Sequence, residues 1–426
     1  MKLNKYCFKL LETSLMTLVS GVAIANELPA SVSDRYISLG VEHTQSNNIS
    51  KSANNAQSGH EQRADLGVGY FNQTATNFTA LDYTVYYATY SDNELDDKSD
   101  ISGSVNLTQE IFSKNLLLNL RHFRRSYLLD QTGVDVPDNS GSRDVFTVNP
   151  VWIIPYSRRA GFEASYTYVA TRFSDDKEQN TNRNGLGLTW YKALNAKTRF
   201  ELSSQVSKVE FDSSGFNYTQ MNVDASLDGK LLAGTYYAQL GYSRLTQDEG
   251  SEEGGIFKLS YTYQFNKHNL SVTAQRELSD SSLGLGDDVS DNAEQEYDES
   301  QVLWIDRVEL QDKFTISERL SNSNTLYYQQ ETEIINDTKK SRWGAFTTFN
   351  LQNTEKLSSF ISLGYSESEV SSALDKEVIN LTLGGRYLFR PHLSFSLRAN
   401  YEDQSITNDV SSYDELRYTA RVDFKY

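Results

Sequence analysis

The sequence predicts an all-β protein: a transmembrane, antiparallel, up-and-down β-barrel of about 20 strands, with an accepted range of about 16 to 22. Three observations predict it. Many segments alternate apolar and polar residues, the connections between them alternate in length, and the last strand ends on an aromatic residue. The composition agrees, because the chain has 27 Tyr but only 5 Pro and 3 Met. We therefore expect helix to be the minor state.

The first residues, 1–25, have the features of a secretory signal peptide. Three lysines precede an apolar stretch at 15–24, and the small residues Ala23 and Ala25 favour cleavage before Asn26. We therefore expect the protein to be exported.

After cleavage, we expect a short periplasmic segment at 26–35 and a single barrel domain at 36–426. The one cysteine, Cys7, lies inside the signal peptide, so the mature chain would have neither disulfides nor thiolate chemistry. No stretch after residue 25 reaches the roughly 18 consecutive apolar residues that a membrane-spanning helix needs.

The clearest strand is 393–402, where the odd-numbered residues from Leu393 to Tyr401 are apolar and the even-numbered residues are polar. A slip of one residue would move Arg398 into lipid, at a cost of roughly 2–4 kcal/mol near the bilayer centre. The register of this strand is therefore well specified. The same alternation recurs at 64–70, 81–87, 101–107, 162–168, 221–227, 257–263, 270–274, 343–349 and 379–387.

The connections fall into a long and a short class. Barrels of the bacterial outer membrane have short periplasmic turns and longer outer loops, and we expect that arrangement here, with about ten loops and about nine turns. The expected loops lie near 45–62, 91–100, 128–144, 174–180, 246–254, 279–300, 332–340 and 404–413. Clear short turns lie around 113–115, 195–197, 228–230, 266–268 and 390–392.

Three segments fit the pattern less well. In 145–154, Pro150 cannot donate to a neighbouring strand, which predicts a bulge or a strand end there. The periodicity of 301–331 is blurred. Segment 116–127 begins with three leucines that fit either face.

The chain ends on alternating residues, Tyr418, Ala420, Val422, Phe424 and Tyr426. This ending resembles the terminal signal by which bacterial outer-membrane barrels are recognised for insertion. The resemblance implies a location in the bacterial outer membrane, with the membrane lipid and the barrel-insertion machinery as partners.

The mature chain also resembles the barrels that are encoded with exopolysaccharide and PEP-CTERM sorting systems. The resemblance rests on turn patterns such as those at 193–198 and 317–321. It implies a role linked to exopolysaccharide, with polysaccharide and its export machinery as possible partners. It brings no catalytic residues to this chain.

Charge and motifs exclude several functions. The formal net charge of −17 argues against nucleic-acid binding, which needs a basic surface. The sequence has no G-x-S-x-G, H-E-x-x-H or phosphate-loop motif and no Cys/His metal spacing. We therefore expect no catalytic site, metal or cofactor. A hydrolase assembled from distant Ser, His and Asp residues stays open as an alternative.

A barrel of about 16 or more strands is too wide for side chains to fill, so we expect a wet or plugged lumen. Six arginines are candidates for contact with a polysaccharide or another solute through guanidinium hydrogen bonds: Arg121, Arg124, Arg125, Arg398, Arg417 and Arg421. Arg158 and Arg159 extend this basic set but fall in an expected turn. Other lumen candidates are Asp82, Asn106, Glu163, Gln220, Asp224 and Asn400.

Two further features have alternative interpretations. The acidic segment 279–300 could bind divalent cations, but its spacing does not match an EF-hand, and a solvated loop is favoured. Aromatic residues could form girdles at the membrane interfaces or stack on sugars inside a pore. The candidates are Tyr86, Tyr87, Trp152, Trp190, Tyr236, Tyr237, Trp304 and Trp343.

The leading functional hypothesis is a channel or translocation component for polysaccharide or other hydrophilic solutes. The alternatives are a barrel that serves as a scaffold for surface polymer and, less favoured, an outer-membrane hydrolase. A secreted β-solenoid or β-sandwich array is the alternative fold, and the variable loop lengths argue against it.

Overall fold

The computed structural model describes most of the chain from residue 32 onward. The predicted signal peptide at 1–25 lies outside the described residues, as does the acidic segment 279–300 beyond Asp280. The described ranges are 32–91, 95–112, 115–128, 136–174, 180–212, 217–247, 250–280, 302–334, 338–371, 374–407 and 412–426.

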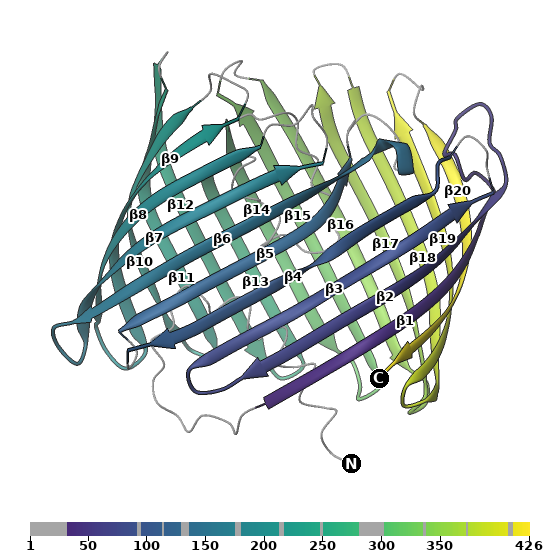
Figure 1. The fold of residues 1–426 in the computed structure, drawn as a ribbon, viewed down its shortest axis with the longest axis horizontal. Helices are drawn as coiled ribbons and strands as arrows, with labels where there is room; N and C mark the ends of the chain where they lie inside the picture. The colour runs from purple at the N-terminus through teal and green to yellow at the C-terminus, as the bar shows by residue number, and fades with distance from the viewer. Residues whose placement is uncertain are drawn as a thin grey trace.

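The strands form one closed antiparallel sheet of 20 strands (Figure 1). Each strand pairs with its neighbours in sequence, and β1 also pairs with β20, which closes the ring. The predicted fold class is confirmed. In chain order the strands are β1 (Val32–Ser46), β2 (Gly59–Gln73), β3 (Asn77–Tyr90), β4 (Lys98–Ile111), β5 (Leu116–Leu128), β6 (Ser140–Pro155), β7 (Ala160–Phe173), β8 (Thr181–Ala193), β9 (Thr198–Phe211), β10 (Tyr218–Leu231), β11 (Gly234–Gln247), β12 (Gly250–Phe265), β13 (His268–Asp280), β14 (Val302–Thr315), β15 (Leu320–Glu333), β16 (Lys339–Gln352), β17 (Leu357–Ser371), β18 (Leu374–Arg390), β19 (Leu393–Ile406) and β20 (Tyr413–Lys425).

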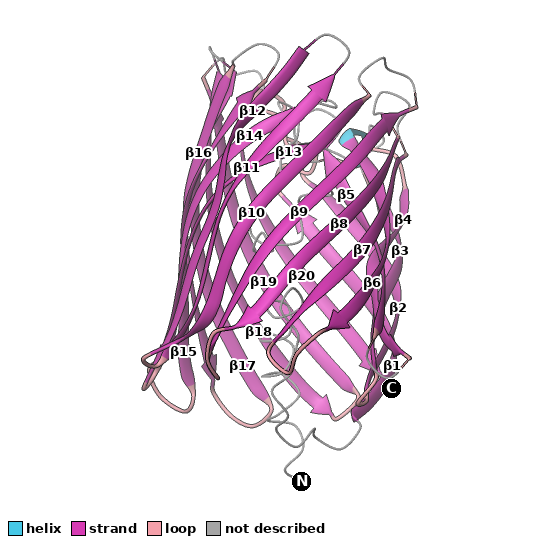
Figure 2. Cartoon of the chain, turned by 90° about the vertical axis from the view of Figure 1, so that its left-hand side faces the viewer, coloured by secondary structure: helices cyan, strands magenta, loops and turns pink. Residues whose placement is uncertain are grey.

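The strands are tilted across the barrel wall, and the two ends of the barrel differ in their connections (Figure 2). At one end, which we call the turn end, the connections are short, as at 74–76 and 391–392. At the other, the loop end, they include 47–58 and 281–301. β1 begins and β20 ends at the turn end (Figure 1). This asymmetry is the one expected from the sequence.

Three boundaries differ from the prediction. β1 begins at Val32, inside the segment expected to precede the barrel, because the pairing with β2 continues as far as Val32 and Gln73. The region 246–254, expected as a polar loop, belongs mostly to β11 and β12, whose pairing continues to Gln247 and Gly250. The turn expected around 228–230 lies at 232–233, because β10 and β11 stay paired as far as Leu231 and Gly234. In all three places extended pairing satisfies backbone groups that a loop would leave to water.

Helix is nearly absent from the described chain. One 3-10 turn, Pro137–Asn139, precedes β6. Among the described residues, no helix is long and apolar enough to cross a membrane.

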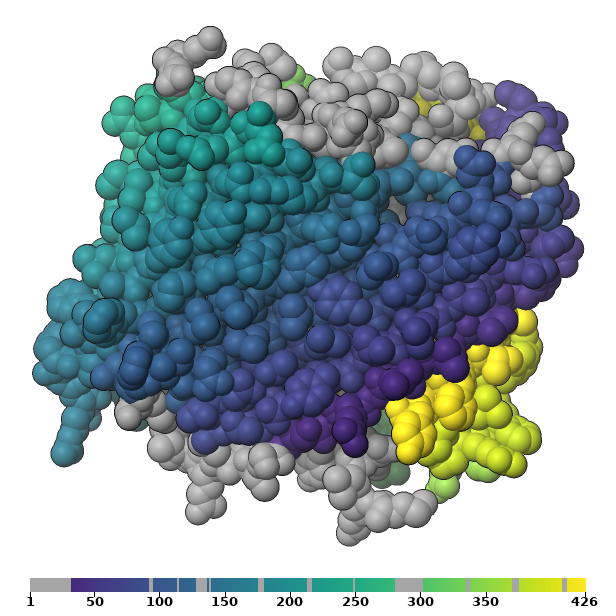
Figure 3. Space-filling view, viewed as in Figure 1, coloured from purple at the N-terminus to yellow at the C-terminus, as the bar shows by residue number. Residues whose placement is uncertain are grey.

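The two faces of the sheet have opposite chemistry. Large apolar side chains such as Leu39, Leu188, Leu240 and Leu397 are about half exposed or more on the outer face. Because side chains alternate along a strand, the residues between them face the lumen, and these are mostly polar. The outer surface is continuous, and the first and last strands lie side by side on it (Figure 3).

The C-terminal strand β20 closes the barrel with its apolar side chains outward. Leu39 pairs with Phe424 and Val41 with Val422, and all four side chains are exposed on the outer face. The backbone N–H groups of Ile37 and Tyr426 each donate to the carbonyl oxygen of the other residue, at 2.9 Å. The apolar residues of the predicted terminal signal therefore face the side where lipid would lie.

Pro150 does not interrupt β6, so the expected bulge or strand end is wrong. The register with β7 is the same before and after Pro150. The side chain of Asn149 compensates for the missing proline N–H, because its Nδ2 donates to the carbonyl oxygen of Tyr166 at 3.1 Å. A side-chain amide thus supplies the bond that the backbone cannot.

Candidate functional site: the inner wall of the barrel

The residues expected to line the lumen do face inward. On β19, for example, Leu397 and Tyr401 are exposed on the outer face, so Arg398, which alternates with them, faces the lumen. Arg398 pairs with Gly384 of β18. Strand alternation places the whole predicted set on the inner face: Asp82, Asn106, Glu163, Gln220, Asp224, Arg398, Asn400, Arg417 and Arg421.

The basic cluster predicted on β5 is split between the two faces. Arg121 pairs with inward-facing Asn106, and Arg125 shares its face. Arg124 alternates with them and therefore lies on the opposite face, away from the lumen, where its Nη1 forms an ion pair with Asp144 at 2.8 Å. Arg158 and Arg159 lie at the opposite end of the barrel, in the turn between β6 and β7. Proximity in sequence therefore does not produce one basic patch.

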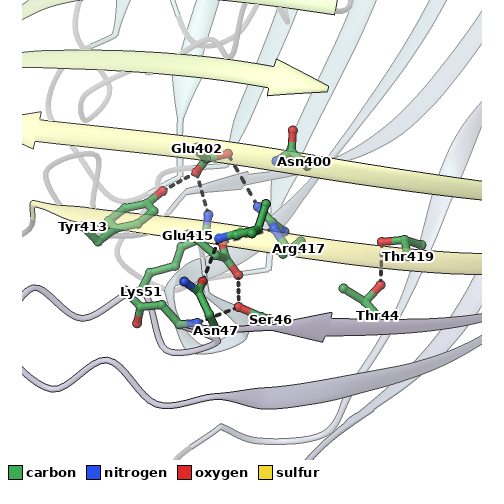
Figure 4. Close-up of polar contacts among 12 residues, drawn as sticks. Thr44, Ser46, Asn47, Lys51, Asn400, Glu402, Tyr413, Glu415, Arg417 and Thr419 are labelled. Atoms are coloured by element: carbon green, nitrogen blue, oxygen red, sulfur yellow. Dashed lines mark hydrogen bonds and ion pairs between the residues drawn. The ribbon is translucent and has the colours of Figure 1, made fainter. Parts of the chain in front are cut away.

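A polar cluster that includes Arg417 lies at the loop end of the β1–β20 seam (Figure 4). Arg417 contacts Glu415 at 3.1 Å and Glu402 at 3.5 Å. The Ser46 hydroxyl donates to Glu415 at 2.6 Å, which ties β1 to β20. Lys51, only 5% exposed, reaches across β20 to Glu402 at 3.1 Å. Tyr413 also donates to Glu402.

Arg421 forms a second polar connection across the same seam. Its Nη1 and Nη2 donate to the two carboxylate oxygens of Asp65 on β2, at 2.7 and 2.9 Å. It also contacts Asp423 at 2.7 Å and Glu42 at 3.5 Å. Two of the predicted solute-contact arginines, Arg417 and Arg421, therefore form ion pairs with carboxylates of the barrel itself.

A ladder of ion pairs runs along the inner face of β14 to β16. Arg307 contacts Glu309 at 2.5 Å, and Arg342 on β16 contacts Glu331 on β15 at 2.5 Å. These four side chains are about 13% exposed or less. Buried charges are kept only when paired, so this ladder is a structural part of the wall.

The loop end of β13 separates from β12, and the loop ends of β13 and β14 turn inward. Pairing between β12 and β13 stops at Phe257 and Arg276, whereas β12 stays paired with β11 up to Gly250. Beyond this point β13 and β14 remain paired only with each other and with β15 among the described strands. We call residues 277–280 and 302–305 the β13–β14 arm.

The β13–β14 arm packs against the inner faces of β9 to β12. Leu278, Val302 and Trp304 form one apolar cluster with the inward-facing residues Val209 and Leu245. The Nε2 of Gln220 on β10 also donates to the carbonyl oxygen of Leu278, at 3.5 Å. The arm therefore narrows the lumen at the loop end.

Trp304 is not a girdle residue, so that prediction is wrong. It is 8% exposed and lies in the apolar cluster. Its ring lies over Gly254, where a Cβ atom would come within 2.8 Å of it. The sequence signal for the arm was the unbroken apolar run Val302–Ile305, which blurred the periodicity of 301–331 and in which every side chain is buried.

The other aromatic candidates divide between the two faces. Trp152 and Trp343 lie on the outer face, and the indole of Trp190 donates to Tyr156 near the turn end. Tyr87 and Tyr236 also face outward. Tyr86, stacked under Arg63, and Tyr237 face the lumen.

A few inward charges form no ion pair within the part of the chain that the structure describes. Arg386 on β18 and Arg398 on β19 form no ion pair with any described residue, and both are exposed. Asp224 and Asp228 on β10 likewise form none in the described chain. In a closed ring of 20 strands, β10 lies nearly opposite β18 and β19. Positive and negative groups that form no ion pair with a described residue therefore lie on opposite sides of the barrel.

Arg386 and the inward phenylalanines Phe346 and Phe360 were not singled out from the sequence, although strand alternation places them inside. Within the described residues, no group of three or more His, Cys, Asp or Glu side chains could hold a metal ion. Cation binding by the segment 279–300 stays untested, because residues 281–301 lie outside the described chain.

No protein-family model matches the chain, and the comparison with curated proteins finds no match. Several solved structures are similar. The FrpB iron transporter from Neisseria meningitidis is 8% identical with a TM-score of 0.46, over 92% of this chain and 81% of that one. Pseudomonas aeruginosa OpdK with vanillate is 11% identical with a TM-score of 0.42, over 92% and 99%. At this level of similarity, function has to be argued from the chain's own residues.

Proposed function

We propose that the protein is an outer-membrane channel for hydrophilic solutes, with saccharides as the solute class. The observation that carries this proposal is the closed ring of 20 strands with an exposed apolar outer face and a polar, charged inner face. An apolar exterior of this extent suits lipid and not water. In this orientation the loop end lies outside the cell and the turn end in the periplasm.

The width of the ring supports a conduit. Barrels of 16–18 strands leave an aqueous channel, and those with 22 strands hold a plug. With 20 strands, this barrel is wider than the first class, and the β13–β14 arm reduces its opening at the loop end. We therefore propose passive passage that is tuned by the inward charges.

Conductance in a planar bilayer tests the proposal. The refolded protein should give stable single-channel steps, and added oligosaccharides should interrupt them. A folded barrel that never conducts would contradict the channel and favour the scaffold. Folding should be checked independently by the shift in gel mobility between heated and unheated samples.

The scaffold for surface polymer is the second candidate. The observation that favours it is the β13–β14 arm, because a barrel that is narrowed from within could hold polymer at its loops without passing it. A hydrolase remains the least favoured alternative. The exopolysaccharide link is part of the proposal, and binding of acidic and neutral saccharides discriminates among these functions.

A further inference from the structure

The inner face of β16 to β19 combines aromatic rings with two arginines that form no ion pair with a described residue. Arg398 pairs with Gly384, and Arg386 lies two residues further along β18 on the same face. Diagonal neighbours in a sheet are about 7–8 Å apart, within reach of long side chains. The two guanidinium groups can therefore act on one ligand.

Both guanidinium groups keep most of their hydrogen-bonding capacity. Arg386 donates one bond, from Nη2 to the Ser394 hydroxyl at 2.9 Å. Arg398 has no hydrogen bond or ion pair with any residue that the structure describes. Arg421, two strands away from Arg386, shows the opposite state, since carboxylates of Asp65 and Asp423 occupy its donors. With five N–H donors each, Arg386 and Arg398 can donate hydrogen bonds to an anionic group.

Two aromatic rings, Phe346 on β16 and Phe360 on β17, lie on the same inner face as these arginines. Phe346 lies over Gly364 of the next strand, with ring carbons at 2.7 and 2.8 Å from where a Cβ would stand. Phe360 lies over Gly384 in the same way. The ring of Tyr327 stacks on Phe346, with centroids 6.1 Å apart and planes 6° apart. The glycines let the rings lie close against the wall, where Phe346 and Phe360 remain partly exposed.

The ligand that fits this combination is a sugar that carries a carboxylate. The positive C–H edges of a pyranose suit the negative face of an aromatic ring. A carboxylate suits the planar fork of guanidinium donors. Neighbouring polar groups are present as well, because the Thr382 hydroxyl donates to Asn400 at 2.7 Å on the same face. Neither Arg386 nor Arg398 forms an ion pair with a carboxylate of the described chain.

We propose that Phe346, Phe360, Arg386 and Arg398 form a binding site for acidic saccharides on the inner wall of the barrel. This proposal rests on the channel proposed above and specifies its ligand class. Neutral saccharides can use the rings but gain nothing from the guanidinium groups.

Equilibrium binding and channel blockade together test the site. Tetragalacturonate and maltotetraose should be titrated into the refolded full-length protein by calorimetry, and added to the same protein in bilayers. The acidic sugar should bind about tenfold more tightly than the neutral one. The double variant Arg386→Gln/Arg398→Gln should lose that tenfold preference and keep the neutral affinity.

Two further variants separate the contributions. Phe360→Leu should weaken the binding of both sugars, because it removes a ring and no charge. Arg244→Gln is the matched control, since it removes a positive charge from an exposed outer position at the loop end. It should change neither affinity. Gel mobility should confirm that each variant is folded.

The site and the channel can fail separately. If wild-type protein conducts but binds the two sugars equally, or if the double variant keeps the acidic preference, the site is overturned and the channel stands. If the folded protein does not conduct but calorimetry shows the expected preference, the channel fails and the site stands.

Discussion

Two seams of the barrel wall are built in opposite ways. At the β1–β20 seam, Ser38–Ser46 pairs with Arg417–Lys425, and polar side chains cross it at Ser46, Lys51 and Arg421. At the β12–β13 seam, pairing stops at Arg276 and apolar side chains of the β13–β14 arm fill the separation. Ion pairs and polar hydrogen bonds therefore stabilise the β1–β20 seam, whereas apolar side-chain packing stabilises the β12–β13 seam.

The difference follows from covalent connectivity. β12 and β13 are joined by a short turn at 266–267, so their turn ends cannot separate even when their loop ends do. β1 and β20 are far apart in the chain, and only non-covalent bonds hold them together. Side-chain ion pairs across the β1–β20 seam therefore help to hold together two strands that no turn connects. At the β12–β13 seam the turn holds the strands at one end, so their loop ends can separate and the β13–β14 arm can lie in the lumen.

The largest expected effect is on the charged seam. Arg421→Leu leaves the Asp65 side chain, 5% exposed, without its bidentate partner. Breaking a buried pair in this way costs about 3–5 kcal/mol. Urea unfolding of the refolded protein should show this loss as a lower midpoint.

Arg398→Leu is the matched control for that loss, because Arg398 is an inward arginine without an ion pair in the described chain. Its free energy of unfolding should stay within about 0.5 kcal/mol of wild type. Equal losses in the two variants would show that the seam does not depend on the Arg421 pair.

The next largest effect is expected in the apolar cluster around Trp304. Trp304→Ala removes a large ring from the apolar cluster and should cost about 3 kcal/mol. It should also raise the single-channel conductance, because the β13–β14 arm loses its main contact with the wall. A normal unfolding midpoint would contradict the packing described for Trp304.

A neighbouring pair of glycines sharpens the test of the arm. A Cβ at Gly254 would meet the Trp304 ring at 2.8 Å, whereas one at Gly255 would have only a carbonyl oxygen at 3.9 Å nearby. Gly254→Val should displace the arm, cost about 1–3 kcal/mol and change the conductance. Gly255→Val should have none of these three effects. Identical conductance in both variants would mean that the arm does not restrict the pathway.

The smallest expected effect concerns Pro150. Asn149→Leu removes the amide that donates to the Tyr166 carbonyl, which should cost about 1 kcal/mol. The midpoint of urea unfolding measures it. If Pro150→Ala is combined with Asn149→Leu, the restored backbone N–H should recover most of the loss, and a failure to recover would refute the compensation.

Alternation of apolar and polar residues was enough to predict the barrel and its inward-facing residues, because lipid and water impose a strict period on each spanning strand. The β13–β14 arm could not be predicted, since its apolar run fits several environments equally well. The pairing of Arg421 with Asp65 was also hidden, because the two residues are 356 positions apart in sequence and only the ring closure brings them together.

Solute flux tests the central claim most directly. Proteoliposomes that contain the refolded protein should swell in iso-osmotic solutions of small neutral saccharides, at rates that fall with solute size and exceed those of protein-free vesicles. This result would support a water-filled conduit that passes hydrophilic solutes. Folded, inserted protein whose vesicles swell no faster than protein-free ones would contradict the channel.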